Sequence, residues 1–442
     1  MVAPLKVGLA GLGTVGASVA QTIARGQAAL AARCGRPIEV VAVTARNKSK
    51  DRGFDAGKLR WAENPLALAR DPGIDVFVEL MGGEGDPAKS AVEAALASGK
   101  SVVTANKALL ARHGFALAQI AEKNNVALNF EAAVGGAIPV IKTLREGFAG
   151  NAVNRISGIL NGTCNYILSR MEREKLSFAD CLKDAQRLGY AEADPAFDIE
   201  GHDTAQKLAI LASLAFGTKV DTGDVYVEGI SSITPDDLLA ADDLGYRVKL
   251  LGVAVRTPKG IEQRVHPTMV PKESEIAQVM GVTNAVSIDF EGIDPITLVG
   301  PGAGGAATAA SVVADIADIA RGMRLPVFGR PADTLAESVK APMQRHEGGY
   351  YIRLMALDKP GTAAMIATRL AEQQISLESI VQRHRGPSPL GGGDPRKASG
   401  PVPVLLVTYA TTEDAVRRAI DAVKADNAIS GEPQLIRIEK NG

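Results

Sequence analysis

A glycine-rich turn near the N-terminus constrains the fold of this chain more than any other feature. Residues 6–10 are an apolar, strand-like run that leads directly into Gly11-x-Gly13-x-x-Gly16, and a helical pattern follows. Gly11 permits a tight turn, Gly13 lets the backbone approach a pyrophosphate, and Gly16 lets the helix pack close to the strand. The first N–H groups of the helix would face the anion. The pattern predicts a dinucleotide site rather than a plain strand–helix turn, formed by Gly11, Gly13, Thr14, Val15 and Gly16.

The composition is that of an ordinary globular protein. The 442 residues suffice for about two to four domains, and 46% are hydrophobic. A formal net charge of −1 leaves no basic surplus for nucleic acid or an anionic membrane. The sequence shows neither a leader nor an apolar stretch long enough to span a bilayer. Because three cysteines in so long a chain favour a reducing compartment, we expect a soluble, cytoplasmic protein.

The N-terminal third alternates expected strands with helical patterns. Such alternation is typical of crossover units and predicts a parallel sheet covered on both faces. We therefore expect an α/β, Rossmann-type NAD(P)-binding domain over residues 1–135, completed by a helix at about 301–325. The expected strands are residues 6–10, 38–44, 76–80, 101–104 and 126–130.

The pattern changes after residue 135. A glycine-rich stretch leads into a helix-like run to residue 148, and residues 136–300 then mix helices with strands, which predicts an α+β domain with a mixed or antiparallel sheet. Its expected helices are residues 165–174, 178–188 and 202–216, and its expected strands are residues 155–160, 247–255, 261–268, 285–290 and 296–299.

The C-terminal segment, residues 349–442, reads as strand, helix, strand, strand, helix, strand. A proline-containing linker at 329–349 marks the expected boundary. The loop at 386–400 is rich in glycine, proline and charge, so we expect it to be mobile. The expected elements are residues 350–356, 362–372, 375–382, 402–409, 412–424 and 434–439.

The end of the second expected strand bears on the choice of cofactor. An NAD site places an acidic residue there for the ribose hydroxyls, but residues 43–48 contain Arg46 and Lys48 and no carboxylate. A guanidinium could hold a 2′-phosphate by paired charge-assisted hydrogen bonds. We therefore favour NADP(H) over NAD(H), with a solvated basic turn as the alternative.

The densest chemistry lies around the helix expected at 202–216. Asp203 and Lys207 are four residues apart and share one helix face. Carboxylates can pair with a substrate ammonium, and a lysine can serve a reacting oxygen as proton donor. The alternatives are an exposed ion pair and a divalent-metal site formed by Asp194, Asp198, His202 and Asp203. The carboxylates that precede the helix are Glu192, Asp194, Asp198 and Glu200.

Lys107 is a second lysine of interest. It directly follows the strand expected at 101–104, and the carboxyl ends of parallel strands border the ligand crevice of an open sheet. An exposed lysine at a helix start is the alternative interpretation.

Several motifs together resemble those of homoserine dehydrogenases. The order of elements after residue 349 resembles an ACT domain, a ferredoxin-like regulatory module that binds amino acids, and the turn 358–361 resembles its ligand loop. No kinase-like segment precedes the match, so the chain resembles the monofunctional form. The motifs are the glycine-rich turn, Thr104-Ala-Asn-Lys107, Glu131-Ala-Ala-Val-Gly-Gly, Asn161-Gly-Thr-Cys-Asn-Tyr166, Leu188-Gly-Tyr-Ala-Glu192-Ala-Asp-Pro and Asp203-x-x-x-Lys207.

The resemblance implies reversible, NAD(P)H-dependent reduction of L-aspartate 4-semialdehyde to L-homoserine in threonine, methionine and isoleucine biosynthesis. By position it implies Lys207 as general acid and base, Lys107 as a lysine on the cofactor side, and Glu192 and Asp203 as substrate ligands. It also implies a monovalent cation, usually Na⁺, feedback by an amino acid, threonine by default, and a homo-oligomer. Further implied positions are Gly189 and Gly302 for the cofactor and Glu131, Val134, Gly136 and Ile138 for the cation.

Two other functions compete with this interpretation. Cys164 could suggest an aspartate-semialdehyde dehydrogenase, which uses a thiolate nucleophile. However, no histidine lies close to Cys164 in the sequence, and the other motifs do not match that enzyme. A non-catalytic amino-acid sensor is the third hypothesis, and the presence of both Lys107 and Lys207 argues against it.

Overall fold

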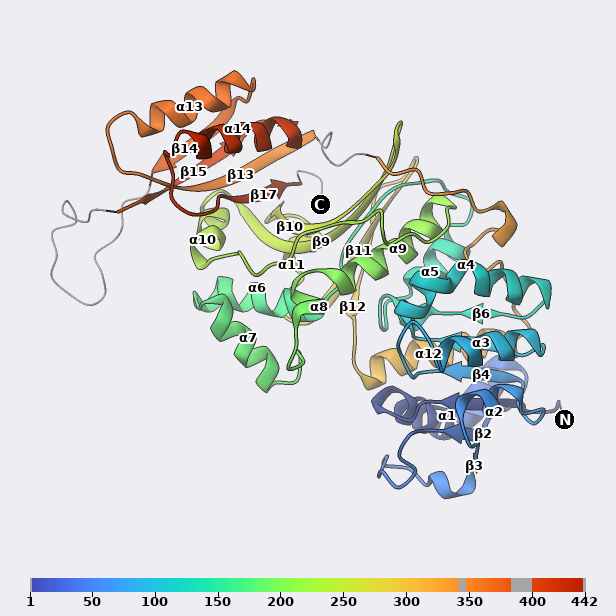
Figure 1. The fold of residues 1–442 in the computed structure, drawn as a ribbon. Coiled ribbons are helices and arrows are strands. Elements are labelled where there is room, and N and C mark those ends of the chain that lie inside the picture. The colour runs from blue at the N-terminus through green and yellow to red at the C-terminus, as the bar shows by residue number, and fades with distance from the viewer. Residues whose placement is uncertain (1, 342–346, 383–399, 440–442) are drawn as a thin grey trace.

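The computed structural model describes residues 2–341, 347–382 and 400–439. Its N-terminal part contains a six-stranded sheet in the order β3-β2-β1-β4-β5-β6, and every neighbouring pair of strands is parallel (Figure 1). The predicted parallel sheet is therefore confirmed, and β3 is an addition to it. The strands are β1 (Leu5–Ala10), β2 (Ile38–Thr44), β3 (Arg60–Trp61), β4 (Val76–Glu79), β5 (Ser101–Thr104) and β6 (Leu128–Asn129).

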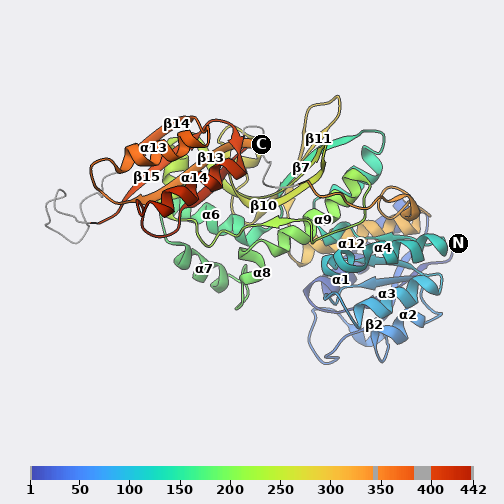
Figure 2. The ribbon, with the colours of Figure 1, turned by 45° about the horizontal axis from the view of Figure 1, so that its top comes forward.

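Helices that follow the strands in the sequence cover this sheet, together with one helix from a segment about 300 residues further along the chain. The helix α12 (Gly305–Ala320) lies against α1 (Figure 2). Ala309, Val312 and Ile316 of α12 share a core with Leu9 of β1 and Val19 of α1. The N-terminal part is thus completed by a segment near residue 310. Its own helices are α1 (Thr14–Cys34), α2 (Pro65–Arg70), α3 (Ala88–Ala97) and α4 (Lys107–Lys123), with a short 3₁₀ turn at Ala56–Lys58.

The backbone conformation and close packing of the turn between β1 and α1 explain why two of its residues must be glycine. Gly11 has a φ of +102°, and a Cβ there would lie 2.5 Å from the Leu80 carbonyl oxygen. A Cβ on Gly16 would lie 2.1 Å from the Gly11 carbonyl oxygen, so only glycine permits this approach of helix to strand. Around Gly13, by contrast, a Cβ would meet nothing within 4 Å. The turn is therefore closed on the protein side and open where a ligand would approach.

The middle of the chain adds an antiparallel sheet in the order β12-β11-β7-β9-β10. The prediction of a mixed or antiparallel sheet after residue 136 is thus confirmed. The short β8 (Tyr226–Val227) pairs with β10 in parallel. The strands are β7 (Val153–Ile159), β9 (Tyr246–Thr257), β10 (Gly260–Pro271), β11 (Thr283–Phe290) and β12 (Ile296–Pro301).

The helix-like run expected up to residue 148 is present over residues 140–147, but it is not α-helical throughout. It consists of α5 (Val140–Lys142) and a π-helical turn over Thr143–Gly147, in which the Phe148 N–H donates to the Thr143 carbonyl. Pro139 removes a backbone donor directly before α5, which limits the run at its start. The remaining helices are α6 (Gly162–Glu174), α7 (Phe178–Arg187), α8 (Ala196–Ile199), α9 (His202–Phe216), α10 (Pro235–Asp243) and α11 (Glu275–Gln278), with 3₁₀ turns at Glu131–Ala133 and Ala332–Thr334.

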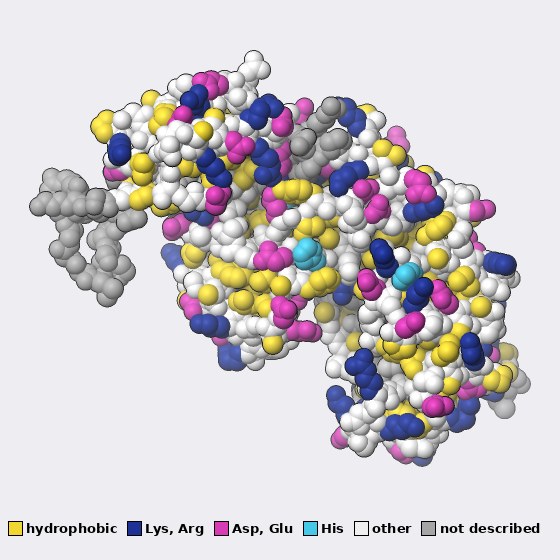
Figure 3. Space-filling view, in the orientation of Figure 1, with side chains coloured by type: hydrophobic (Ala, Val, Ile, Leu, Met, Phe, Trp, Pro, Cys, Tyr) yellow, Lys and Arg dark blue, Asp and Glu magenta, His cyan; other side chains and the backbone are white. Residues whose placement is uncertain are grey.

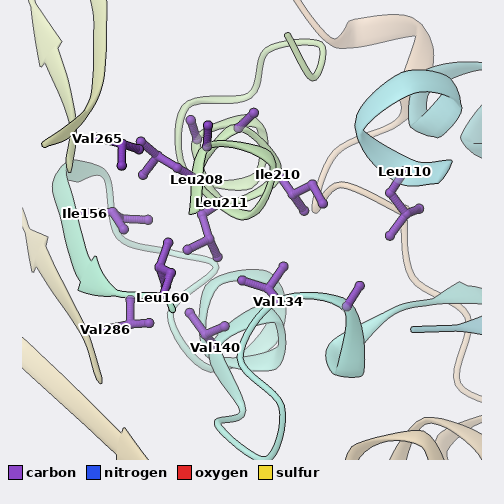
Figure 4. Packing of buried hydrophobic residues seen from close by; sticks show 14 of the residues in the cluster. Leu110, Val134, Val140, Ile156, Leu160, Leu208, Ile210, Leu211, Val265 and Val286 are labelled. Carbon is purple, nitrogen blue, oxygen red and sulfur yellow. The ribbon is translucent and has the colours of Figure 1, made fainter. Parts of the chain in front are cut away.

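The helix α9 lies in the centre of the main hydrophobic core (Figure 4). Leu208 and Leu211 are completely buried and pack among Ile156 and Leu160 from the β7 region and Val140 of α5. Burying a leucine side chain contributes about 2 kcal/mol relative to leaving it exposed. This packing fixes the rotation of α9 and therefore the direction in which its polar residues point.

The C-terminal segment forms four antiparallel neighbours in the order β17-β13-β15-β14. Its two helices contact each other and share a core with β13 and β15. The edge strand β17 also pairs with β10 in parallel, so the two sheets join into one of 11 strands. The elements are β13 (Glu347–Ala356), α13 (Thr362–Glu372), β14 (Leu377–Gln382), β15 (Val402–Thr408), β16 (Thr411–Thr412), α14 (Glu413–Ala425) and β17 (Gln434–Ile438). The loop expected to be mobile lies, apart from Gly400, outside the described residues.

Cationic and anionic side chains are interspersed on the face drawn in Figure 3, without one extended basic patch there.

Within the described ranges, no helix combines the length and the apolar character that crossing a membrane requires.

Lys249 of β9 is a lysine whose side chain lies in the protein interior. It is 1% exposed, and its Nζ donates to the Asn165 Oδ1 at 3.0 Å and to the Val279 carbonyl. It thereby ties β9 to α6 and to the segment after α11. Burial, with a smaller effect of Arg247, lowers the pKa of Lys249 to about 7.

This lowered pKa predicts a pH-dependent stability. Between about pH 7 and pH 10 the Lys249 amine is mostly protonated in the unfolded chain and mostly neutral in the folded one. The free energy of unfolding should therefore rise with pH, by up to about 1.4 kcal/mol per pH unit. The variant Lys249→Met lacks this gain. Thermal unfolding should show that, from pH 7 to pH 9, the melting temperature of the wild type rises relative to that of Lys249→Met. It should not rise relative to that of Lys272→Met, the control at a more exposed lysine. Equal pH dependence of all three proteins would contradict the assignment.

Candidate active site

A cavity of about 330 Å³ lies where the N-terminal part meets the middle of the chain. We call it the central cavity. It borders the carboxyl ends of β4 and β5, which is where open parallel sheets place their ligands. Val15 of α1 and Gly302 before α12 line it, as do both lysines singled out in the sequence. Its lining is Val15, Leu80, Met81, Gly82, Ala105, Asn106, Lys107, Ala132, Ala133, Val134, Lys207, Gly302, Ala303 and Thr308.

Asp203 joins the two lysines. Its Oδ2 lies 2.8 Å from the Lys207 Nζ, and its Oδ1 lies 3.2 Å from the Lys107 Nζ. Burial opposes ionisation of Asp203, but the charges of Lys207 and Lys107 outweigh it and lower the pKa of Asp203 to about 2. The Lys207 Nζ also donates to the Leu160 carbonyl at 2.8 Å. The two ammonium groups are therefore held by one ionised carboxylate at the cavity.

Asn161 fixes the other side of Asp203. Its Nδ2 lies 2.9 Å from both the Asp203 Oδ2 and the Asp198 Oδ1, while its Oδ1 caps α6 at the Cys164 N–H. Burial and the negative charge of Asp203 raise the pKa of Asp198. The sequence singled out Asp198 as one of several carboxylates and as a ligand of the alternative metal site, and Asn161 only as part of a motif. The fold brings both beside Asp203.

Other carboxylates of the predicted group do not join this cluster. Glu192 and Asp194 are exposed, and Glu200 accepts a hydrogen bond from the Ser231 hydroxyl instead. Gly189 has a φ of +76° but is not among the residues that line the central cavity. Within the described chain no group of His, Cys, Asp and Glu is arranged to hold a metal ion, so the divalent-metal alternative finds no support.

The basic residues after β2 lie near the glycine-rich turn. Arg46 is exposed, as a residue that binds a ligand phosphate would be. Arg52, which the sequence did not single out, donates from its Nε to the Leu12 carbonyl at 3.1 Å, and its guanidinium lies 5.6 Å from the centre of the Trp61 ring. Arg52 therefore brings a second guanidinium to this turn. The sequence did not indicate Arg52 because an irregular loop separates it from β2.

Cys164 does not fit the role of a nucleophile. Its thiol is completely buried and donates to the Asp198 carbonyl at 3.2 Å. Burial, together with the negative charges of Asp198 and Asp203, raises the pKa of Cys164 well above its usual value. Since the thiolate is the reactive form, the thiolate mechanism finds no support in this geometry.

The predicted cation residues surround a second buried cluster. The two oxygens of Glu131 accept hydrogen bonds from the Ile141 and Lys142 N–H groups, at 2.8 and 2.9 Å. Burial and the neighbouring charge of Asp315 raise the pKa of Glu131 to about 7. The Gly136 carbonyl accepts from the Ser311 hydroxyl of α12 at 2.6 Å. Val134 lines the central cavity and Ile138 is buried, so this cluster adjoins the cavity.

Glu79, at the end of β4, is a site residue that the sequence did not reveal. It is 0% exposed, and its carboxylate accepts hydrogen bonds from the Met81 and Gly82 N–H groups, at 2.7 and 3.1 Å. It also accepts from the Thr104 hydroxyl at 2.7 Å. Only its place at a strand end could have indicated this role, because its partners lie in another strand and in a loop.

The contacts of Glu79 extend to Lys107. The Thr104 Oγ1 accepts from the Asn106 N–H, and the Asn106 side chain caps α4 at the Leu109 N–H. Lys107 is the first residue of α4. Glu79 therefore orders both the loop that lines the central cavity and the helix start that carries one of its lysines.

We predict that Glu79→Gln weakens dinucleotide binding about tenfold or more. A glutamine amide cannot accept all three hydrogen bonds, and hydrogen bonds to a charged group contribute about 1.5–3 kcal/mol. Quenching of protein fluorescence or isothermal calorimetry with NADP would measure the effect. The exposed Glu84 on the same loop offers the control Glu84→Gln. Unchanged affinity in Glu79→Gln would show that the loop does not depend on this carboxylate.

Comparisons with known proteins agree with the geometry. A family model described as homoserine dehydrogenase matches residues 139–317, and one described as the homoserine dehydrogenase NAD binding domain matches residues 11–131. Homoserine dehydrogenases of Pseudomonas aeruginosa and Neisseria gonorrhoeae are 44% and 42% identical to the chain, each over 99% of both sequences.

Solved structures give the same answer. The crystal structure of a homoserine dehydrogenase from Thiobacillus denitrificans has a TM-score of 0.91 and 43% identity, and the match covers 99% of each chain. A hyperthermophilic archaeal homoserine dehydrogenase in complex with NADPH has a TM-score of 0.62 and 26% identity over 72% of this chain and 98% of that one. The chain therefore belongs to the homoserine dehydrogenase family and is an NAD(P)-dependent oxidoreductase that acts on a CH–OH group.

Proposed function

We propose that the protein catalyses the reversible reduction of L-aspartate 4-semialdehyde to L-homoserine, a step in threonine, methionine and isoleucine biosynthesis. The observation that carries this proposal is the Lys207–Asp203–Lys107 cluster at the central cavity, between the glycine-rich turn and the core helix α9. The substrate carries an aldehyde oxygen, which must gain a proton, and an α-ammonium, which a carboxylate can bind. The cluster provides groups of both kinds.

Lys207 is the proposed proton donor. Its side chain is 13% exposed and that of Lys107 is 32% exposed, so Lys207 is the more shielded from water. It would give a proton to the carbonyl oxygen during reduction, in which NAD(P)H would supply the hydride, and take one from the hydroxyl during oxidation, in which NAD(P)⁺ would accept it. Asp203 keeps Lys207 oriented through the 2.8 Å contact. Lys107 would help position the reacting groups from the cofactor side.

Asp203 and Glu192 are the proposed ligands of the substrate ammonium. The two lysines keep Asp203 ionised, so it carries the negative charge that a substrate ammonium would bind. Glu192 is exposed, and its backbone carbonyl accepts from the Gln186 side chain at 3.1 Å. Its carboxylate is therefore accessible to a substrate that enters from solvent.

NADP(H) is the proposed preferred cofactor. The glycine-rich turn fits a dinucleotide because Gly13 leaves open space in front of the 21-residue helix α1. Arg46 would hold the 2′-phosphate, since residues 43–48 at the end of β2 contain no carboxylate to bind the ribose hydroxyls of NAD. Gly302, which lines the central cavity, and Gly189 would lie against the cofactor.

A monovalent cation such as Na⁺ is proposed beside Glu131. Main-chain carbonyls of Val134, Gly136 and Ile138 would supply most of the oxygens, and Glu131, whose carboxylate accepts from two N–H groups, is the position at which the side chain matters. A cation there would stabilise the ionised form of a carboxylate whose pKa is raised. It would act on structure, by holding the segment that lines the central cavity.

The C-terminal segment is proposed to be an ACT domain that binds an amino acid and assembles the chain into a homo-oligomer. Its strand order β17-β13-β15-β14 corresponds to the 4-1-3-2 order of ferredoxin-like modules. The Asp358–Gly361 turn leads directly into α13, with Gly361 at a φ of +90°. Threonine is the proposed effector.

We predict that Lys207→Met lowers kcat for homoserine oxidation with NADP by about 10²-fold or more, because proton transfer by a positioned side chain contributes about 10²–10⁴-fold. Absorbance of the reduced nicotinamide measures the rate. The exposed Lys183 of α7 gives the control Lys183→Met. Equal turnover of Lys207→Met and wild type would rule out the mechanism.

We also predict that Arg46→Met raises the KM for NADP about tenfold while leaving the KM for NAD nearly unchanged. The variant loses a charge-assisted hydrogen bond, about 1.5 kcal/mol, that only the 2′-phosphate can accept. Steady-state kinetics with both cofactors measures this. A parallel rise in both KM values would instead mean that Arg46 serves the fold of the turn.

A further inference from the structure

Arg52 lies in the segment between β2 and β3, and main-chain carbonyls surround its guanidinium. The Nε donates to the Leu12 carbonyl at 3.1 Å, and the Nη1 donates to those of Lys48 and Lys50, at 3.3 and 2.5 Å. The Nη2 donates to the Asn47 carbonyl. A guanidinium has five N–H donors, and these contacts use four of them. The side chain of Arg52 is therefore engaged with the backbone, which leaves little of it for a ligand.

These contacts connect the two halves of the candidate dinucleotide site. Leu12 belongs to the glycine-rich turn, whereas the other three carbonyls belong to the loop 46–50, which follows β2. In a site of this kind the pyrophosphate lies at the turn, and the adenosine ribose lies near the end of the second strand. Arg52 therefore fixes the position of the loop relative to the turn that would hold the pyrophosphate.

The loop carries a concentrated positive charge. Of the seven residues 46–52, four are Lys or Arg and one is Asp. Main-chain carbonyls surround the Arg52 charge, whereas Arg46, Lys48 and Lys50 are exposed and accessible to an anion. A phosphate monoester has a charge of about −1.5 to −2 at pH 7. Such a group would compensate the charge that the loop presents to solvent.

Contacts from α1 and β3 hold the same segment. The Gln21 Nε2 of α1 donates to the Arg52 carbonyl at 3.0 Å. The centre of the Trp61 ring lies 5.6 Å from the Arg52 guanidinium and 5.9 Å from the Lys48 Nζ. Trp61 is the only tryptophan in the sequence. Its fluorescence therefore reports on the surroundings of this loop.

We propose that Arg52 is a positioning residue for the adenosine 2′-phosphate of the cofactor. It holds the loop 46–50 beside the glycine-rich turn so that Arg46 meets the phosphate, and it does not bind the phosphate itself. The role at the phosphate rests on the proposed preference for NADP(H), whereas the hold on the loop requires no cofactor. Arg52→Lys separates the two roles of the side chain, because it keeps the charge but loses the planar fork that reaches several carbonyls at once.

Limited proteolysis with trypsin tests the hold on the loop in the free protein. Cleavage after Lys48 or Lys50, identified by mass spectrometry, should be about tenfold faster in Arg52→Met and in Arg52→Lys than in wild type, because the loop opens more often. Lys58→Met, at an exposed lysine of the same segment, should leave the rate unchanged. Thermal unfolding checks that each variant is folded. Equal cleavage in wild type and both Arg52 variants overturns the inference.

Cofactor affinity, measured by isothermal calorimetry and followed through Trp61 fluorescence, tests the consequence for binding. Arg52→Met and Arg52→Lys should each weaken NADP binding about tenfold and NAD binding less than about threefold, since the loop is no longer pre-organised for the phosphate. The kcat at saturating NADP should stay close to that of wild type. In an Arg46→Met background, Arg52→Met should cost less than about threefold in NADP affinity, because the group that it positions is gone.

The outcomes separate positioning from direct binding. Full NADP affinity in Arg52→Lys would mean that the charge alone acts, and it overturns the inference. Losses that multiply in the double variant overturn it as well, because they would show two independent phosphate contacts. A wild type that binds NADP no more tightly than NAD refutes the proposed cofactor preference, and the role at the phosphate with it. Because binding is measured without homoserine, an inactive wild type refutes the proposed reaction alone.

Discussion

The contact of one buried carboxylate with two lysines organises the candidate active site of this protein. Asp203 is 5% exposed, and without Lys107 and Lys207 its charge would be strongly destabilised by burial. Conversely, the carboxylate holds two like charges close together at one cavity. Because Lys107 starts α4 and Lys207 lies within α9, the ion cluster also fastens the nucleotide-binding part to the catalytic core. The chemistry and the packing of the two parts thus depend on the same interaction.

The rest of the fold serves to deliver these groups. The core around Leu208 and Leu211 sets the rotation of α9, and the buried Glu79 orders the start of α4 through Thr104 and Asn106. Gly16 lets α1 approach β1, and α12 then packs on α1 from far along the chain. Each lysine is therefore fixed by apolar packing or by a hydrogen-bonded chain, which is the pre-organisation that proton transfer requires.

Local patterns predicted most of the elements. The alternation of strands and helices gave the parallel sheet, and the helix at 202–216 has the predicted bounds because its apolar residues repeat at helical spacing. The run to residue 148 is helical, but its pattern did not reveal that most of it is a π-helical turn rather than an α-helix. In the candidate site, Lys107 and Lys207 could be singled out because they stand at a strand end and on an apolar helix, and the structure brings them to one cavity. Glu79, Asn161 and Arg52 were missed because their roles depend on long-range partners.

A double-mutant cycle on kcat/KM tests the central claim most directly. It compares Asp203→Asn, Lys207→Met and the double variant for homoserine oxidation with NADP. If Asp203 holds Lys207, the loss of activity in the double variant is clearly smaller than the product of the two single losses, because residues that act as a unit are not additive. If the two losses multiply, Asp203 and Lys207 act independently, and the account of one shared cluster is wrong.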